Sequence, residues 1–305
     1  MSVPSPASSG WRTYALLGAG VAVVSTASIL IRYAQADGAP SLAIAALRLG
    51  IATVVLTLFI APRLATELPR VTRRDLLLAV ASGGVLAVHF AAWISSLAFT
   101  SVASSAALVT TNPVWVGIAS LVILRERLAP AAIVGVVLGL GGSVLVLLSD
   151  QATGETATAS QPLLGNGLAL LGAVMASAYL LIGRGLRARV SLQTYVWLVY
   201  AAAAVVLCLL ALGAGAFTAP WGPVAWVCMI GLALGPQLIG HTTLNWALRR
   251  VSATLVALAI LGEPVGAALL AWLLFDETFT GLQLAGFALL LAGIFVAARG
   301  ERTSP

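Results

Sequence analysis

Ten apolar runs dominate this chain, and each is long enough to cross a membrane as a helix. About 20 residues are needed for that crossing, at a rise of about 1.5 Å per residue. The chain is 60% hydrophobic and only 9% charged, whereas soluble domains carry about 25% charged residues. Strands of a membrane barrel would be shorter and would alternate between polar and apolar residues. The sequence therefore predicts an all-α membrane protein with ten transmembrane helices, over about 14–32, 41–61, 76–99, 102–124, 130–149, 163–183, 193–213, 223–247, 252–274 and 281–298.

All sixteen basic residues are arginine, and their distribution predicts the orientation of the chain. If the N-terminus is cytoplasmic, arginines occupy the inner connections and both tails, while the outer connections carry none. The two exceptions, Arg32 and Arg48, lie within predicted helices. Because cytoplasmic loops are enriched in basic residues, we expect both termini on the cytoplasmic side of an inner or plasma membrane. The net charge of +6 therefore records the orientation of the chain in its partner, the lipid bilayer, and does not indicate binding to nucleic acid.

The chain repeats itself with an offset of 151 residues. Pro113 and Glu126 in TTNPVWVGIASLVILRERL recur as Pro264 and Glu277 in ILGEPVGAALLAWLLFDETF. Each half contains five predicted helices, and an odd number reverses the membrane orientation of the second half. Inverted repeats of this kind are an architecture of secondary transporters. We therefore expect repeats at 14–149 and 163–298, an outer linker at 150–162, and cytoplasmic tails at 1–13 and 299–305.

A family resemblance accompanies the repeat. Both halves have Pro-Val followed by Glu thirteen residues after the proline, and the first half also contains ALRLG around Arg48 and the stretch SLAFTSVASSAAL. Over essentially the whole chain, these features resemble the EamA family of the drug/metabolite transporter superfamily. The second half departs locally, with Phe-Asp-Glu where that family commonly has Gly-Glu. The resemblance implies a ten-helix secondary transporter, often an exporter of amino acids or other small metabolites, but it does not identify the substrate.

Glu263 and Asn112 occupy equivalent repeat positions, each directly before a proline inside an apolar run. Pro264 and Pro113 each remove a backbone donor, so a kink or gate is expected there. A carboxylate within a membrane span is costly and usually functional. We therefore expect Glu263 to bind a cationic substrate or to carry a coupled proton. The alternatives are a permanent ion pair with Arg48, or a protonated carboxyl that donates a hydrogen bond between helices.

Two histidines and one arginine complete the main candidates. His89 and His241 match at an offset of 152 and could bind substrate, and His89 could also relay protons. Interhelical hydrogen bonding is their alternative role. Arg48 is expected to gate or brace the protein, unless it reaches the outer interface and pairs with Asp37. The remaining candidates are side chains within spans that either line a cavity or pack against neighbouring helices: Ser25, Thr26, Trp93, Tyr179, Gln237 and Asn245.

Several kinds of chemistry have no sequence signal. The chain lacks H-E-x-x-H, G-x-S-x-G and P-loop motifs and paired intramembrane aspartates, so neither an enzyme nor an ATP-driven pump is indicated. Cys208 and Cys228 have no partners at metal-ligand spacing, and neither a metal nor a cofactor is expected. A channel would need a broader polar stripe. The sequence predicts a transporter of a small molecule. A flippase or carrier of a lipid-like substrate and a homodimer are compatible with it, and an intramembrane enzyme is least favoured.

Overall fold

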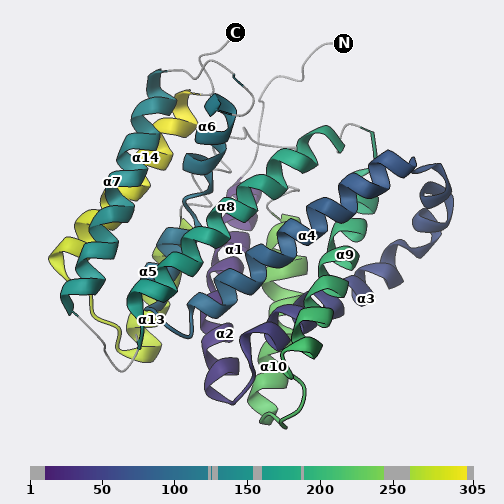
Figure 1. The fold of residues 1–305 in the computed structure, drawn as a ribbon, viewed down its shortest axis with the longest axis horizontal. Helices are drawn as coiled ribbons and strands as arrows, with labels where there is room; N and C mark the ends of the chain where they lie inside the picture. Colours follow the sequence, from purple (N-terminus) through teal and green to yellow (C-terminus); the bar gives the residue numbers. More distant parts are fainter. Residues whose placement is uncertain are drawn as a thin grey trace.

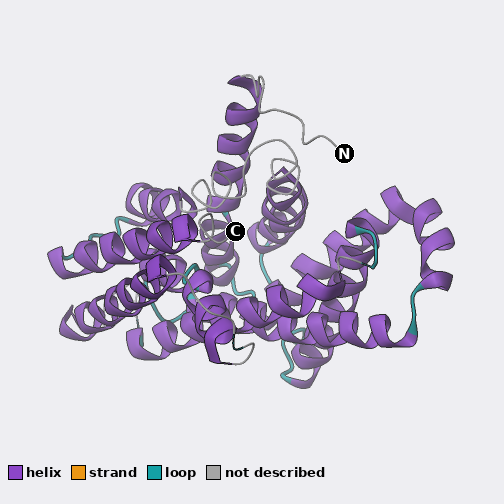
Figure 2. Cartoon of the chain, turned by 90° about the horizontal axis from the view of Figure 1, so that it is seen from above, coloured by secondary structure: helices purple, strands orange, loops and turns teal. Residues whose placement is uncertain are grey.

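The computed structural model describes residues 11–122, 125, 130–153, 160–186, 189–243 and 262–300, and their regular structure is helical throughout (Figure 2). Eight helical segments of this part are long and apolar enough to cross a membrane, and two shorter apolar segments cover Gly262–Phe275 and Gly281–Gly293. The elements are α1 (Trp11–Ser25), α2 (Ala27–Ala36), α3 (Ser41–Glu67), η1 (Leu68–Arg70), α4 (Arg73–Ser96), α5 (Val102–Val109), α6 (Asn112–Val122), α7 (Pro130–Thr153), α8 (Pro162–Leu186), α9 (Leu192–Gly213), α10 (Pro223–Leu232), η2 (Ala233–Gly240), α13 (Gly262–Phe275) and α14 (Gly281–Gly300).

Three of the eight spans are interrupted helices. α1 passes into α2 through Thr26, and α5 ends just before Asn112 and Pro113 start α6. α10 continues as the π-helical segment η2, which contains Pro236. The proline at 113 cannot supply a backbone donor, which explains the break expected there from the sequence. Such breaks and π-helical turns are frequent at functional sites because they place polar groups irregularly inside a bundle.

α7 and α14 cross each other closely through glycine. A Cβ added to Gly142 would lie 2.7 Å from the carbonyl oxygen of Gly286, and one added to Gly293 would lie 2.7 Å from that of Gly135. The contact partners run in opposite order along the two helices, so the helices are antiparallel. Figure 1 shows them side by side at one end of the bundle, while α3, α4 and α9 pack together at the other.

Between these two ends, helices from different parts of the chain pack against each other. α8 packs on α4 and α5, α2 packs on α10, and α1 packs on η2 and α13. Large apolar side chains point outward on the perimeter helices, for example Leu58 at 75% exposure and Phe59 at 80% on α3. Apolar surface on this scale suits contact with lipid rather than water.

Candidate functional site

Arg48 lies at the centre of a buried group of polar and aromatic side chains. Only 1% of it is exposed, and its Nε donates a hydrogen bond of 2.9 Å to Oε1 of Gln237 in η2. Its guanidinium carbon lies 4.5 Å from the ring centroid of Phe90 and 5.5 Å from that of Trp93. Rings at these distances attract a cation through their quadrupoles. Arg48 thus joins α3 to α4 and to the π-helical segment.

The expected alternative for Arg48, an ion pair with Asp37 at the outer interface, is wrong. Asp37 accepts a hydrogen bond of 2.8 Å from the backbone N–H of Ala225 instead. The ion pairs among the described residues join Arg32 to Glu277, Arg63 to Glu67 and Arg189 to Asp75. Neighbouring helices cover Arg48 completely, so its side chain turns into the bundle rather than toward the surface.

His89 and Trp93 lie one helical turn apart on α4 and stack on each other. Their ring centroids are 6.0 Å apart at an interplanar angle of 20°. Nδ1 of His89 lies 2.8 Å from the carbonyl oxygen of Gly172 in α8. Since a carbonyl oxygen only accepts, Nδ1 carries the proton, and Nε2 of the neutral ring is left as an acceptor. Gly172 permits this approach, because a Cβ there would lie 3.3 Å from the Cβ of Trp93.

Residues of the second half complete the group. Tyr200 of α9 interacts with Gln237 and Arg48. Glu263 of α13 lies within electrostatic range of Arg48, and His241 lies within that range of both Arg48 and His89. Among the described residues, Glu263 and Arg48 do not come within the 4 Å of an ion pair, so the alternative of a permanent pair between them is not realised. We call this group the Arg48 cluster; its members are Arg48, His89, Phe90, Trp93, Tyr200, Gln237, His241 and Glu263.

Asn112 and Glu263 are held by serines in equivalent ways. The Ser177 hydroxyl lies 3.0 Å from the backbone carbonyl oxygen of Asn112 and 2.8 Å from that of Ala173 in its own helix, so its one proton is shared between them. The Ser25 hydroxyl likewise lies 3.3 Å from the carbonyl oxygen of Glu263 and 2.9 Å from that of Val21. Oδ1 of Asn112 is buried without a hydrogen-bond partner. No hydrogen bond or ion pair of the described residues links the Asn112 side chain to the Arg48 cluster.

The other candidates from the sequence make contacts of their own or lie outside the described residues. Thr26 Oγ1 donates to the carbonyl of Val23 in the preceding turn over 2.7 Å. Tyr179 stacks on Tyr195, with ring centroids 6.4 Å apart. Pro264 is a buried residue of the first turn of α13, whereas Pro113 is exposed. Asn245 lies outside the described residues.

Two members of the Arg48 cluster had no role in the sequence interpretation. Phe90 and Tyr200 each sit in an apolar run where aromatic residues normally pack against neighbours. The spacing of His89, Phe90 and Trp93 did contain a usable signal, because residues one, three and four apart place several rings on adjoining faces of a helix. Tyr200 carries no comparable signal, since its position depends on how α9 packs.

A second polar network lies near the ends of α5, α7, α8 and α14. Asp150 accepts hydrogen bonds from Asn166, Ser104 and Gln283, and all four of these side chains are buried. Asn166 also accepts a hydrogen bond of 2.8 Å from Thr100. Each polar atom named here has a partner within the network, so it braces the ends of these helices.

Glu277 anchors the loop after α13. Its carboxylate accepts hydrogen bonds from the backbone N–H groups of Val102 at 2.9 Å and Ala103 at 3.3 Å, and Arg32 lies 3.4 Å away. Burial raises the pKa of Glu277, and the backbone donors and the charge of Arg32 oppose that rise. The carboxylate sits where the positive end of the α5 dipole favours an anion. These contacts give Glu277 a structural role at a helix end.

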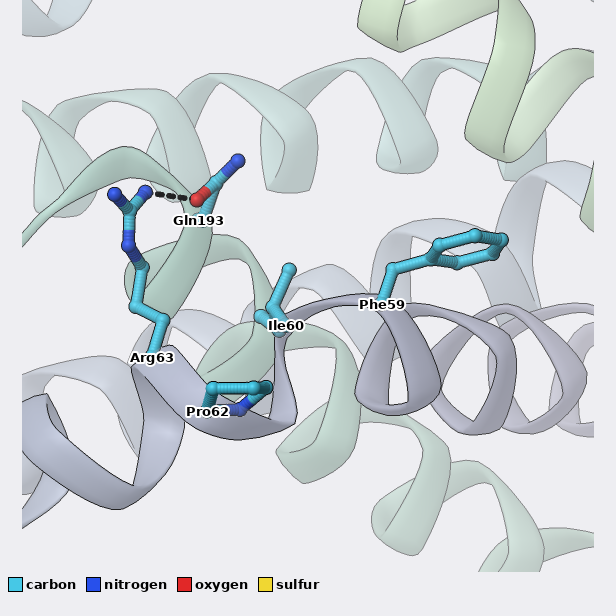
Figure 3. Close-up of a pocket in the computed structure, with 5 residues that line it drawn as sticks. All are labelled: Phe59, Ile60, Pro62, Arg63 and Gln193. Carbon is cyan, nitrogen blue, oxygen red and sulfur yellow. Dashed lines mark hydrogen bonds between the residues drawn. The ribbon is translucent and has the colours of Figure 1, made fainter.

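Two surface pockets lie away from the Arg48 cluster. One of about 280 Å³ is lined by Phe59, Ile60, Pro62, Arg63 and Gln193, where Arg63 donates a hydrogen bond to Gln193 (Figure 3). A second of about 280 Å³ lies between η1 and the start of α9. Neither contains a member of the cluster. Among the described residues, no group of three or more His, Cys, Asp or Glu side chains is placed to hold a metal ion.

Comparison with known proteins agrees with the fold. The model of the EamA-like transporter family matches residues 11–148 and again residues 163–299. A solved structure described only as the crystal structure of a protein matches with a TM-score of 0.62 and 22% sequence identity, covering 97% of this chain and 100% of that chain. At this identity the likeness shows the fold alone. No curated protein matches the chain. Its apolar helices and the two family matches show that the chain is a multi-pass membrane protein that belongs to the EamA-like transporter family.

Proposed function

We propose that this protein is a secondary transporter that exports a small organic metabolite by alternating access, with the Arg48 cluster as its substrate site. One observation carries the proposal. Both family repeats contribute to the cluster: Arg48, His89, Phe90 and Trp93 come from the first, and Tyr200, Gln237, His241 and Glu263 come from the second. A site between two repeats changes its access when the repeats rock against each other.

The proposal includes ten spans in two inverted repeats. The antiparallel crossing of α7 and α14 supports this, because Gly135 and Gly142 of the first repeat have Gly286 and Gly293 as their sequence equivalents. Gly142 meets Gly286, and Gly135 meets Gly293. A two-fold axis in the membrane plane exchanges each glycine with its sequence equivalent. It therefore converts the contact between Gly142 and Gly286 into the contact between Gly293 and Gly135. α13 and α14 would complete the ninth and tenth spans.

The orientation follows from the arginines. The loop from Arg63 to Arg74 and the connection at Arg189 belong to one side of the bundle, and the arginine-free connections after α2, α9 and α13 belong to the other. The basic side faces the cytoplasm of an inner or plasma membrane. Both termini are then cytoplasmic.

Glu263 is the coupling residue of this proposal. It is a carboxylate inside a membrane bundle, and its only ion-pair candidate in the cluster, Arg48, remains beyond contact distance. Such a residue is retained when it meets a charged ligand or a proton. Glu263 therefore binds the cationic group of the metabolite or carries a proton during the cycle, with His89 as a second proton carrier.

The first test is ligand-induced stabilisation of the purified protein. A ligand that binds only the folded form raises the melting temperature by mass action. The panel contains amino acids, polyamines, quaternary amines, nucleosides and sugars, applied to the wild type and to Glu263→Gln. Asp276→Asn is the matched control, because Asp276 is an exposed carboxylate just beyond α13.

The expected result is stabilisation by one chemical class that is lost in Glu263→Gln and kept in Asp276→Asn. Equal stabilisation of both variants would remove Glu263 from the site. If no compound of this panel stabilises the protein but an added lipid does, the substrate would be lipid-like rather than a soluble metabolite.

A further inference from the structure

Two donor groups in the Arg48 cluster lack partners. Nη1 of Arg48 and Nε1 of Trp93 are both buried without a hydrogen-bond partner. The residues themselves are almost fully enclosed, with 1% of Arg48 and 5% of Trp93 exposed. They are also neighbours, since the guanidinium carbon lies 5.5 Å from the centroid of the Trp93 ring.

Unpaired donors of this kind are unusual inside a folded protein. Buried polar groups are nearly always hydrogen-bonded, because a donor that loses its hydrogen bonds to water and gains no new one destabilises the folded protein. Elsewhere in the bundle, Trp115 donates to Thr111 over 3.0 Å and Trp197 donates to Thr57 over 2.7 Å. Trp221 also has an unpaired N–H, but it lies in the loop before α10.

The chemistry of the two groups defines what can satisfy them. A guanidinium and an indole N–H can only donate, so their partner must be an acceptor. The charge of Arg48 favours an anionic acceptor, and guanidinium groups match the two oxygens of a carboxylate in geometry. A cationic or purely apolar ligand would leave both donors unmet.

We propose that Arg48 and Trp93 bind the carboxylate of the transported metabolite. This inference rests on the proposed function, because it assigns one end of the ligand within the same site. Nε of Arg48 is already held by Gln237, which fixes the guanidinium and leaves Nη1 for the ligand. Phe90 and Trp93 cover the guanidinium face and provide apolar surface for the rest of the ligand. The carboxylate end thus lies at α3 and α4, and Glu263 serves the opposite, cationic end.

For each amino acid that stabilises the protein, the test compares four matched compounds. These are the amino acid, its amide, its decarboxylated amine and its N-acetyl derivative. The proteins are the wild type, Arg48→Gln and Trp93→Phe. Trp93→Phe keeps an aromatic ring on this helix and removes the N–H donor together with part of the indole ring. Trp226→Phe is the control, because Trp226 is 47% exposed on α10.

Loss of the carboxylate should weaken binding to the wild type about tenfold or more, as expected for a charge-assisted hydrogen bond. Trp93→Phe should bind the amino acid about threefold to tenfold more weakly, and Trp226→Phe should bind it normally. If Arg48→Gln does not fold, Trp93→Phe alone decides.

Several results would overturn the assignment. One is binding of the amide or the amine as tight as that of the acid, and another is an unchanged acid affinity in Trp93→Phe. Either result with intact transport rejects the carboxylate contact and leaves the transporter proposal standing. Absence of any transported compound would reject both. Failure of every carboxylate compound to bind, while another class binds, also rejects the inference.

Discussion

The hydroxyl of Ser177 in α8 bonds to the backbone carbonyl of Asn112 at the start of α6, over 3.0 Å. Ser25, its equivalent in the sequence repeat, makes the matching bond to the carbonyl of Glu263 over 3.3 Å. Equivalent serines thus hold the two residues that precede the repeated prolines. The repeat in the sequence has become a repeated contact in space.

Removal of either hydroxyl should cost stability. Ser177→Ala loses a bond between helices and should lower the free energy of unfolding by about 1 kcal/mol. Ser143→Ala is the control, since Ser143 Oγ is equally buried but donates only to Gly139 of its own helix. Thermal unfolding in one detergent measures both. An effect of Ser177→Ala no larger than that of Ser143→Ala would show that the interhelical bond contributes nothing.

The crossing of α7 and α14 predicts a large difference between adjacent glycines. Gly142→Ala places a Cβ 2.7 Å from the carbonyl oxygen of Gly286, so it should destabilise the protein by about 1–3 kcal/mol. Gly141 has nothing within 4 Å of its added Cβ. Gly141→Ala should therefore be neutral or stabilise by up to about 1 kcal/mol, because alanine favours the helix. Equal melting temperatures for the two variants would contradict this close approach.

Glu277 should give stability a defined pH dependence. Burial raises its pKa in the folded protein above the ordinary value of 4.5. The folded form then holds the proton more tightly than the unfolded chain does. Its contribution to stability is full below pH 4.5 and is lost as pH rises through the folded-state pKa. The melting temperature of the wild type minus that of Glu277→Gln should therefore fall from about pH 4 to about pH 8. A difference that grows with pH would mean that the N–H donors and Arg32 outweigh burial.

Orientation can be tested with cysteines introduced on the two sides. In a background that lacks Cys208 and Cys228, Thr218→Cys lies in the loop after α9, and Thr66→Cys lies at the end of α3. The arginine distribution predicts that an impermeant thiol reagent labels Thr218→Cys in intact cells. Thr66→Cys should react only after the membrane is permeabilised. The opposite labelling pattern would reverse the proposed topology.

The sequence was sufficient for the helical architecture but not for the depth of individual side chains. Apolar runs and the spacing of repeated residues such as Pro113 and Pro264 follow from local pattern, so they could be predicted. Arg48 was placed within reach of the surface because position along a helix was the only guide. Its burial depends on Phe90 and Gln237, which lie on other helices and are distant in sequence.

The interruptions within the spans were also only partly predictable. The break before Pro113 follows from proline chemistry. The break at Thr26 has no neighbouring proline or glycine to indicate it, and the Thr26 hydroxyl donates to the carbonyl of Val23 in the preceding turn. The π-helical segment η2 contains Pro236 and packs against α1 and α3. The proline could be read from the sequence, whereas the packing partners could not.

Counterflow in proteoliposomes tests the central claim most directly. Vesicles are loaded with an unlabelled compound that stabilises the protein, and uptake of its labelled form is followed for the wild type, Glu263→Gln and Asp276→Asn. The account predicts transient accumulation with the wild type and with Asp276→Asn, and at least a tenfold slower uptake with Glu263→Gln, of the order expected when one charged contact is lost. Uptake by Glu263→Gln at the wild-type rate and with the wild-type pH dependence would contradict it.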